Sequence, residues 1–66
     1  MKQKHYLRQF FEYAHLPDRL KAVSEPFSKL AENVDDLLPD NPEKTASLRK
    51  LLEAKDCAVR ALIFTT

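Results

Sequence analysis

Glycine is absent from this chain of 66 residues, and four prolines mark its breaks instead. The clearest break is the run Leu38-Pro39-Asp40-Asn41-Pro42. A residue before proline is disfavoured in the helical region, so a helix preceding this run is expected to end near Leu38. Asn41 then supplies an N-cap, and Pro42 takes the first position of a new helix. A connection this short places the flanking helices antiparallel, as a hairpin with its turn at residues 38–42.

The helix after the turn is predicted to run from Pro42 to about Phe64, because no breaker interrupts that segment. Positions spaced alternately three and four apart form a seam of the coiled-coil type along one side of it. The seam consists of Thr45, Leu48, Leu52, Lys55, Val59 and Leu62, and Leu51 and Ala58 widen it. The segment 61–64 is apolar on every side, which predicts partners on more than one face.

The helix before the turn is predicted from a single apolar face. That face consists of Phe27, Leu30, Ala31, Val34 and Leu37. The upstream segment Leu16–Val23 also has helical character. Pro26 either kinks one continuous helix or lies in the first turn of a new helix that Ser24 caps. We favour the kinked, continuous helix.

A third and shorter helix is predicted near the N-terminus, over Lys4–Tyr13. One face of this helix consists of Tyr6, Leu7, Phe10, Phe11 and Ala14. We expect this helix to fold over the hairpin or over a neighbouring subunit. The sequence thus predicts an all-α single domain over residues 1–66, with a short N-terminal helix and a long antiparallel helical hairpin.

The small size of the chain favours oligomerisation. A domain of this length buries only about 60% of its unfolded surface and usually needs a disulfide, a metal or a partner subunit. Cys57 is the only cysteine, so an internal disulfide is excluded, and we expect Cys57 to be a small buried hydrophobe. His5, His15 and Cys57 lack metal-ligand spacing and are one ligand short of a closed zinc site, so no metal is expected. A compact homo-oligomer remains the expectation.

The charge and hydropathy of the chain exclude some partners. The formal net charge is +1 with 32% charged residues, whereas a protein that binds duplex DNA normally carries a clear basic excess. No apolar run approaches the roughly 20 residues of a membrane span. The N-terminus also lacks the continuous apolar core of a secretory signal. We therefore expect a cytoplasmic protein with neither duplex DNA nor a membrane as its partner.

No catalytic pattern stands out in the sequence. Neither a Gly-rich phosphate loop nor a nucleophile elbow occurs, and neither histidine lies one helical turn from a serine. The carboxylates Asp18, Asp35 and Asp36 lie in charged segments, and we interpret them as solvated helix faces and end charges. We therefore expect no enzymatic activity and no cofactor.

Two cations on the second long helix are candidates for a binding site. Lys55 lies in the seam between Leu52 and Val59, where an aliphatic residue would pack better. Its stem either packs while the ammonium reaches solvent or a carboxylate, or the ammonium lines a cleft for an anionic ligand. Arg60 adds a second cation to the same stretch.

Four further candidates lie upstream of the turn. Tyr13 is either ordinary core or a platform on which a base stacks. His15 is either a structural hydrogen-bonding residue or a ligand contact. Lys21 and Lys29 are eight residues apart and so lie near one face, either as solvated surface or as ligand contacts.

Several segments of the chain, taken together, resemble a known family. They are Phe11-Glu12-Tyr13, Lys29-Leu30-Ala31-Glu32, the turn segment 38–45 and the helical segment 51–61. In these segments, and over most of residues 10–63, the chain resembles the phage-encoded anti-CBASS sponges, whose helical-hairpin domain is shared with anti-Thoeris sponges.

The resemblance implies a binding function without catalysis. Members of that family hold cyclic oligonucleotide second messengers of bacterial immune systems without cleaving them, in pockets between the subunits of a compact hexamer. An aromatic ring stacks on a base, and Tyr13 occupies the corresponding position. A lysine meets a phosphate, and Lys21 and Lys29 are its nearest counterparts.

The function expected from the resemblance is therefore phage immune evasion. The protein would sequester cyclic di- and trinucleotides inside the infected cell and block CBASS-type signalling. The alternative from the residues alone is a small helical interaction module that binds a host or phage protein through its apolar faces.

Overall fold

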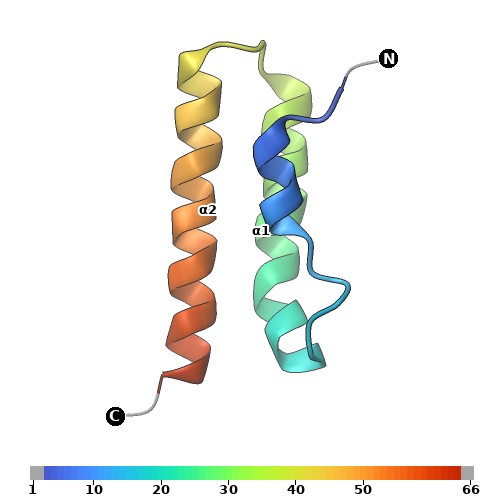
Figure 1. Ribbon diagram of the computed structural model, residues 1–66, viewed down its shortest axis with the longest axis vertical. Coiled ribbons are helices and arrows are strands. Elements are labelled where there is room, and N and C mark those ends of the chain that lie inside the picture. The colour runs from blue at the N-terminus through green and yellow to red at the C-terminus, as the bar shows by residue number, and fades with distance from the viewer. Residues whose placement is uncertain (1–2, 65–66) are drawn as a thin grey trace.

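Two long antiparallel helices make up most of the molecule (Figure 1). The computed structural model describes residues 3–64. Along the chain come a short 3-10 helix, η1 (Tyr6–Phe11), and two α-helices, α1 (Asp18–Leu37) and α2 (Pro42–Ile63). The all-helical hairpin predicted from the sequence is confirmed. No helix within residues 3–64 is both long and apolar enough to cross a membrane.

The turn between α1 and α2 forms as its residues predict. The N–H of Leu38 closes α1 with a 3.2 Å hydrogen bond to the carbonyl of Val34, and Leu38 itself is extended. The side-chain oxygen of Asn41 accepts a 2.8 Å hydrogen bond from the backbone N–H of Lys44. Pro42 follows at the start of α2, where its missing N–H costs nothing. Local sequence signals therefore fix both helix ends at this turn.

The first long helix is continuous through Pro26, as the favoured interpretation expected. It begins at Asp18, two residues later than the helical character of Leu16 had indicated, because Pro17 holds an extended backbone at the N-cap. Ser24 lies inside the helix and caps nothing. The far end of the hairpin is closed by Arg19, whose guanidinium donates a 2.9 Å hydrogen bond to the carbonyl of Leu62.

The buried face of α1 differs from the predicted one. Leu30 and Leu37 are 48% and 80% exposed, although both were expected in the core. Successive residues advance by about 100° around a helix, and both leucines lie on the same flank of the stripe through Ala31. The residues buried on the opposite flank are Ser24 and Asp35. The helix is thus rotated so that two polar residues face inward in place of two leucines.

The seam of α2 is confirmed, since all of its predicted residues are buried or half-buried. Leu48 is its centre and is fully buried against η1 and α1. Cys57 is exposed, so its predicted burial was wrong. It lies on the outer side of the helix, away from the seam.

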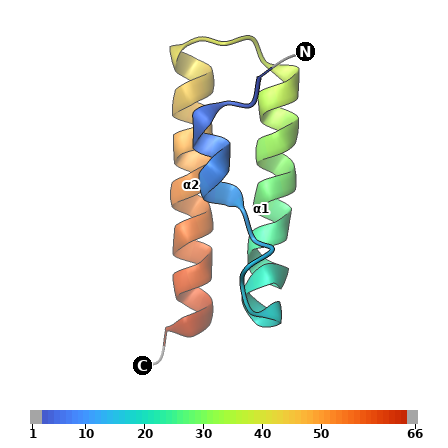
Figure 2. The same cartoon turned by 45° about the vertical axis from the view of Figure 1, so that its right-hand side comes forward.

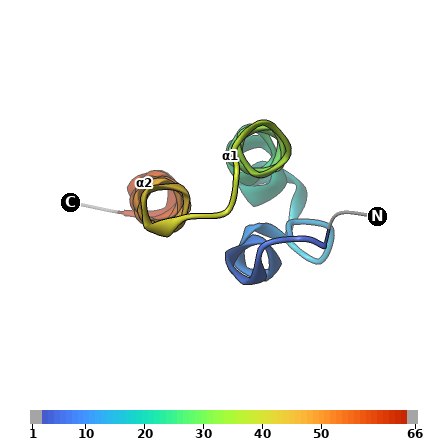
Figure 3. The same ribbon diagram turned by 90° about the horizontal axis from the view of Figure 1, so that it is seen from above.

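The N-terminal segment is shorter and more tightly wound than predicted. It is a six-residue 3-10 helix rather than a helix over Lys4–Tyr13, and it folds over the hairpin of its own chain. Figures 2 and 3 show it on one face of the hairpin, running alongside α1 and α2. Leu7 and Phe11 enter the core, whereas Tyr6 and Phe10 are 58% and 50% exposed. Ala14 of the predicted apolar face is exposed as well, so three of the five residues of that face remain outside the core.

Candidate ligand-binding site

Four of the six predicted site residues lie around two adjoining hollows on the molecule. Tyr13 and His15 belong to the connection between η1 and α1, and Lys55 and Arg60 belong to α2. The hairpin brings these two distant parts of the sequence together beside the end of η1. The site therefore depends on the tertiary fold and not on any local motif.

The first of these, the Ser24 hollow, has a volume of about 380 Å³. It lies where the end of η1, the following connection, α1 and α2 meet. Its lining consists of Gln9, Phe10, Glu12, His15, Leu16, Ser24, Lys55, Asp56, Val59 and Arg60. The size falls within the range of ordinary small-ligand pockets.

The second, the Tyr13 hollow, has a volume of about 430 Å³. It is lined by Glu12, Tyr13, Ala14, His15 and Ser28. Glu12 and His15 line both hollows, so the two are neighbours. Tyr13 is half-buried, which leaves part of its ring available to a ligand.

Lys55 holds the end of η1 against α2. Its ammonium donates a 2.9 Å hydrogen bond to the carbonyl of Phe10 and lies 3.1 Å from a carboxylate oxygen of Asp56. The side chain is only 15% exposed, so its stem packs in the seam, as the first of its two interpretations expected. Because Lys55 also lines the Ser24 hollow, the second interpretation stays open.

Arg60 is more available than Lys55. It is exposed, and its guanidinium contacts the sulfur of Cys57 at 3.3 Å. Among residues 3–64 it forms no ion pair. A guanidinium in this position keeps its donors for a ligand at the rim of the hollow.

Ser24 is a site residue that the sequence did not indicate. The residue is 2% exposed, and its hydroxyl oxygen has no hydrogen-bond partner within the described part of the chain. A buried polar group left unpaired costs about 1–3 kcal/mol. The signal in the sequence is slight, because a serine two residues before Pro26 also fits the position of a helix cap.

The other two predicted cations do not join this site. Lys21 lies 3.9 Å from a carboxylate oxygen of Asp18, and Lys29 lies at the same distance from one of Glu25. Neither lysine lines the Ser24 hollow or the Tyr13 hollow. Within one chain, both therefore act as surface residues in exposed ion pairs worth at most about 1 kcal/mol.

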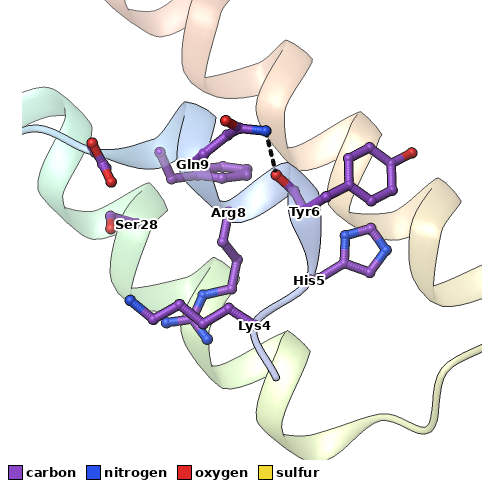
Figure 4. A pocket seen from close by; sticks show the side chains of 8 residues that line it. Lys4, His5, Tyr6, Arg8, Gln9 and Ser28 are labelled. Carbon is purple, nitrogen blue, oxygen red and sulfur yellow. Dashed lines mark hydrogen bonds between the residues drawn. The ribbon is translucent and has the colours of Figure 1, made fainter. Parts of the chain in front are cut away.

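A third hollow of about 320 Å³ lies beside η1, on the side where Ser28 of α1 is found (Figure 4). Lys4, His5, Tyr6 and Arg8 line it, together with Ser28 of α1. The rings of His5 and Tyr6 stack with centroids 4.7 Å apart. The imidazole of His5 also accepts a 3.2 Å hydrogen bond from the N–H of Leu7 and lies 3.0 Å from the hydroxyl of Thr45. These contacts fix the start of η1, so His5 is structural.

Behind this hollow lies a buried ionic cluster centred on Asp35. One carboxylate oxygen accepts hydrogen bonds from the backbone N–H of His5 at 3.0 Å and from Arg8 at 3.1 Å. The other lies 2.6 Å from the ammonium of Lys44, and both side chains are almost completely buried. Lys44 also donates to the carbonyls of Asp35 and Leu38 at the end of α1.

The interpretation of Asp35 as a solvated residue was therefore wrong. Burial alone would raise the pKa of its carboxyl, but the hydrogen bonds from His5, Lys44 and Arg8 outweigh burial. They hold the pKa of Asp35 well below its ordinary value of 3.8. The sequence signal for this burial is the position of Asp35 one helical turn after Ala31, on the side facing the core.

No group of three or more metal-ligating side chains occurs within residues 3–64. Compared with known protein families, curated proteins and solved structures, the chain gives no significant match.

Proposed function

We propose that this protein binds and sequesters cyclic oligonucleotide second messengers without cleaving them, as a phage protein that blocks CBASS-type signalling. The observation that carries the proposal is the gathering of Tyr13, His15, Lys55 and Arg60 around two adjoining hollows. The resemblance of the sequence to anti-CBASS sponges supplies the biological role, and with it a place in the cytoplasm of the infected bacterium.

The chemistry of the two hollows suits such a ligand. A cyclic di- or trinucleotide presents flat bases and a few phosphates in a compact ring. The ring of Tyr13 offers a surface on which one base stacks. Arg60 at the neighbouring rim offers a guanidinium to a phosphate, with which it can form paired hydrogen bonds. Capture by stacking and a few cations needs no large net charge on the protein.

The assembly proposed for this function is a homo-oligomer, and the resemblance points to a hexamer. Large apolar side chains remain exposed on the single chain: Tyr6, Phe10, Leu30, Leu37, Leu38, Ile63 and Phe64. A second copy would remove these side chains from water. Lys21 or Lys29 of one subunit would then meet a ligand held by another.

A binding panel tests the proposal. Purified protein is titrated with cyclic di- and trinucleotides, then denatured, and the released ligand is identified by mass spectrometry. We expect binding with intact recovery. Degraded ligand would indicate an enzyme instead, and the absence of binding across the panel would contradict the proposal.

The central variant is Tyr13→Ala. Stacking on an aromatic ring is worth about 1–3 kcal/mol, so the dissociation constant should rise about five- to 150-fold. Tyr13→Phe keeps the ring and should lose much less. Tyr6→Ala is the comparison variant, because Tyr6 is the other tyrosine and lines a different hollow; sedimentation must show that both variants keep the assembly of the parent. Unchanged affinity in Tyr13→Ala would show that the ring is not the stacking surface.

The exposed apolar side chains also favour a second candidate, a helical module that docks onto a host or phage protein. The same panel separates the two. An interaction module would bind none of the cyclic nucleotides, and neither the parent nor the Tyr13 variants would then show measurable affinity.

A further inference from the structure

Ser24 is an unusual residue for the interior of α1. Its hydroxyl oxygen is buried and has no partner within residues 3–64, although an alanine would fit the same helical position without that cost. Ser24 also lines the hollow between the η1–α1 connection and α2. A polar group that is unpaired in the free protein and lies at a hollow can obtain its hydrogen bond from whatever fills that hollow.

The charges around the Ser24 hollow indicate what kind of group would fill it. Lys55 and Arg60 are cations, whereas Glu12 and Asp56 are carboxylates, so their formal charges cancel. Arg60 is the cation proposed above to meet a phosphate, and the remaining charged residues of the lining, Lys55, Asp56 and Glu12, together do not favour a second phosphate. The lining does suit a neutral group that carries hydrogen-bond donors and acceptors side by side.

The walls of the hollow point to a flat ring. Phe10 and Val59 contribute apolar surface beside the polar groups. A guanine base fits this combination, because its exocyclic amine and ring N–H donate to carboxylates while O6 and N7 accept from arginine or lysine. Uracil lacks the exocyclic amine and the N7 acceptor.

We propose that the Ser24 hollow holds the polar edge of a guanine base and that the hydroxyl of Ser24 pairs with that base. This inference rests on the proposed function and adds a base preference to it. The Tyr13 hollow adjoins through Glu12 and His15, so one cyclic dinucleotide can stack one base on Tyr13 and place the other against Ser24. The hydroxyl is buried in the free protein, so side chains lining the hollow must move aside to admit the base. Gln9 and Arg60 are exposed lining residues, and moving them would break their hydrogen bonds to the carbonyl of Tyr6 and the sulfur of Cys57.

The variant Ser24→Ala tests this inference through two opposite effects. Removing an unpaired buried hydroxyl should leave the melting temperature of the free protein unchanged or raise it. By calorimetry, the same variant should bind cyclic di-GMP about tenfold more weakly. Its affinity for cyclic di-UMP should change by less than about threefold, because uracil does not offer the same edge. Ser47→Ala is the control, since Ser47 is exposed on α2, and it should change neither property.

The possible results separate this inference from the proposed function. If cyclic di-GMP binds Ser24→Ala as tightly as the parent, the Ser24 assignment is wrong, while loss of affinity in Tyr13→Ala still supports sequestration. An equal loss for both ligands would mean that Ser24 contacts the shared phosphodiester ring, which overturns the guanine assignment. If the parent binds no cyclic nucleotide, the proposed function fails and this inference fails with it.

Discussion

Asp35 receives hydrogen bonds from the backbone of His5 and the side chain of Arg8, and its other oxygen pairs with Lys44 of α2. One carboxylate thereby joins the N-terminal segment, α1 and α2. Burying a charge is costly, and it is tolerated here because every neighbour is a donor or a cation. Lys44 is compensated in turn by Asp40 and by two carbonyls at the end of α1. The cluster fixes where η1 lies on the hairpin.

The first prediction concerns the pH dependence of stability. The pKa of Asp35 is lowered on folding, so its contribution is fully present above the ordinary pKa of 3.8 and is lost as pH falls through the folded value. Urea unfolding from pH 7 to pH 2 should show the free energy of unfolding declining from about pH 4 downward.

The matched variants isolate this carboxyl. Asp35→Asn should be less stable at pH 7 by about 3 kcal/mol, because Lys44 loses its closest counter-charge. That is a large part of the roughly 3–10 kcal/mol expected for a domain of this size. Its stability should also vary less with pH below 4. Asp36→Asn is the control, since that side chain is 62% exposed. Equal effects at positions 35 and 36 would contradict the assignment.

At the scale of the elements, the turn between α1 and α2 serves both helix ends at once. Asn41 accepts the backbone N–H of Lys44 and so satisfies a donor at the start of α2. The ammonium of the same lysine caps carbonyls at the end of α1. The two caps are therefore coupled, because the helical geometry that Asn41 imposes places Lys44 against α1.

The second prediction follows from this coupling. Asn41→Ala should destabilise the protein by about 1 kcal/mol or more, measured by urea unfolding. Asn33→Ala is the matched control, because Asn33 is exposed inside α1, where alanine is the better helix former. It should be neutral or slightly stabilising. A similar loss in both variants would mean that the cap does not matter.

On the scale of the whole molecule, the chain is long and thin, with extents of 41 × 21 × 15 Å. The layer that covers the hairpin is η1, which has six residues, so it covers only a small part of the two long helices. The buried apolar residues within residues 3–64 are Leu7, Phe11, Ala31 and Leu48. Such a small core favours association, as proposed above.

The third prediction concerns that association. Ile63 is 54% exposed on the single chain, so a charge there should not disturb the fold of the chain by itself. In an oligomer that buries this end of α2, Ile63→Asp should dissociate the assembly and lower its melting temperature. Lys50→Glu is the control, since Lys50 is exposed and already charged. Sedimentation of the parent as a 7.7 kDa monomer at micromolar concentration would overturn the expectation.

The sequence by itself determined the two long helices and the turn between them. Pro39, Asn41 and Pro42 act through the backbone of their immediate neighbours, and the seam around Leu48 follows from helical periodicity. These are local effects, and they leave few alternatives in a chain without glycine. The continuity of α1 through Pro26 was one of two interpretations that the sequence left open, and the structure shows one helix from Asp18 to Leu37.

Only the tertiary structure decided how each helix is rotated about its axis and which residues of η1, α1 and α2 come into contact. Periodicity allows Asp35, one turn after Ala31, to face inward, but it could not predict that Asp35 and Ser24 are buried while Leu30 is exposed. The burial of Asp35 depends on its ion pairs with Arg8 and Lys44, which belong to other elements. The same long-range packing shortens η1 and leaves Tyr6 outside the core. It also brings His15 and Lys55 together around one hollow and leaves Lys29 outside it. The residue types indicate these candidates for ligand binding, but whether they form one site depends on contacts that only the folded hairpin creates.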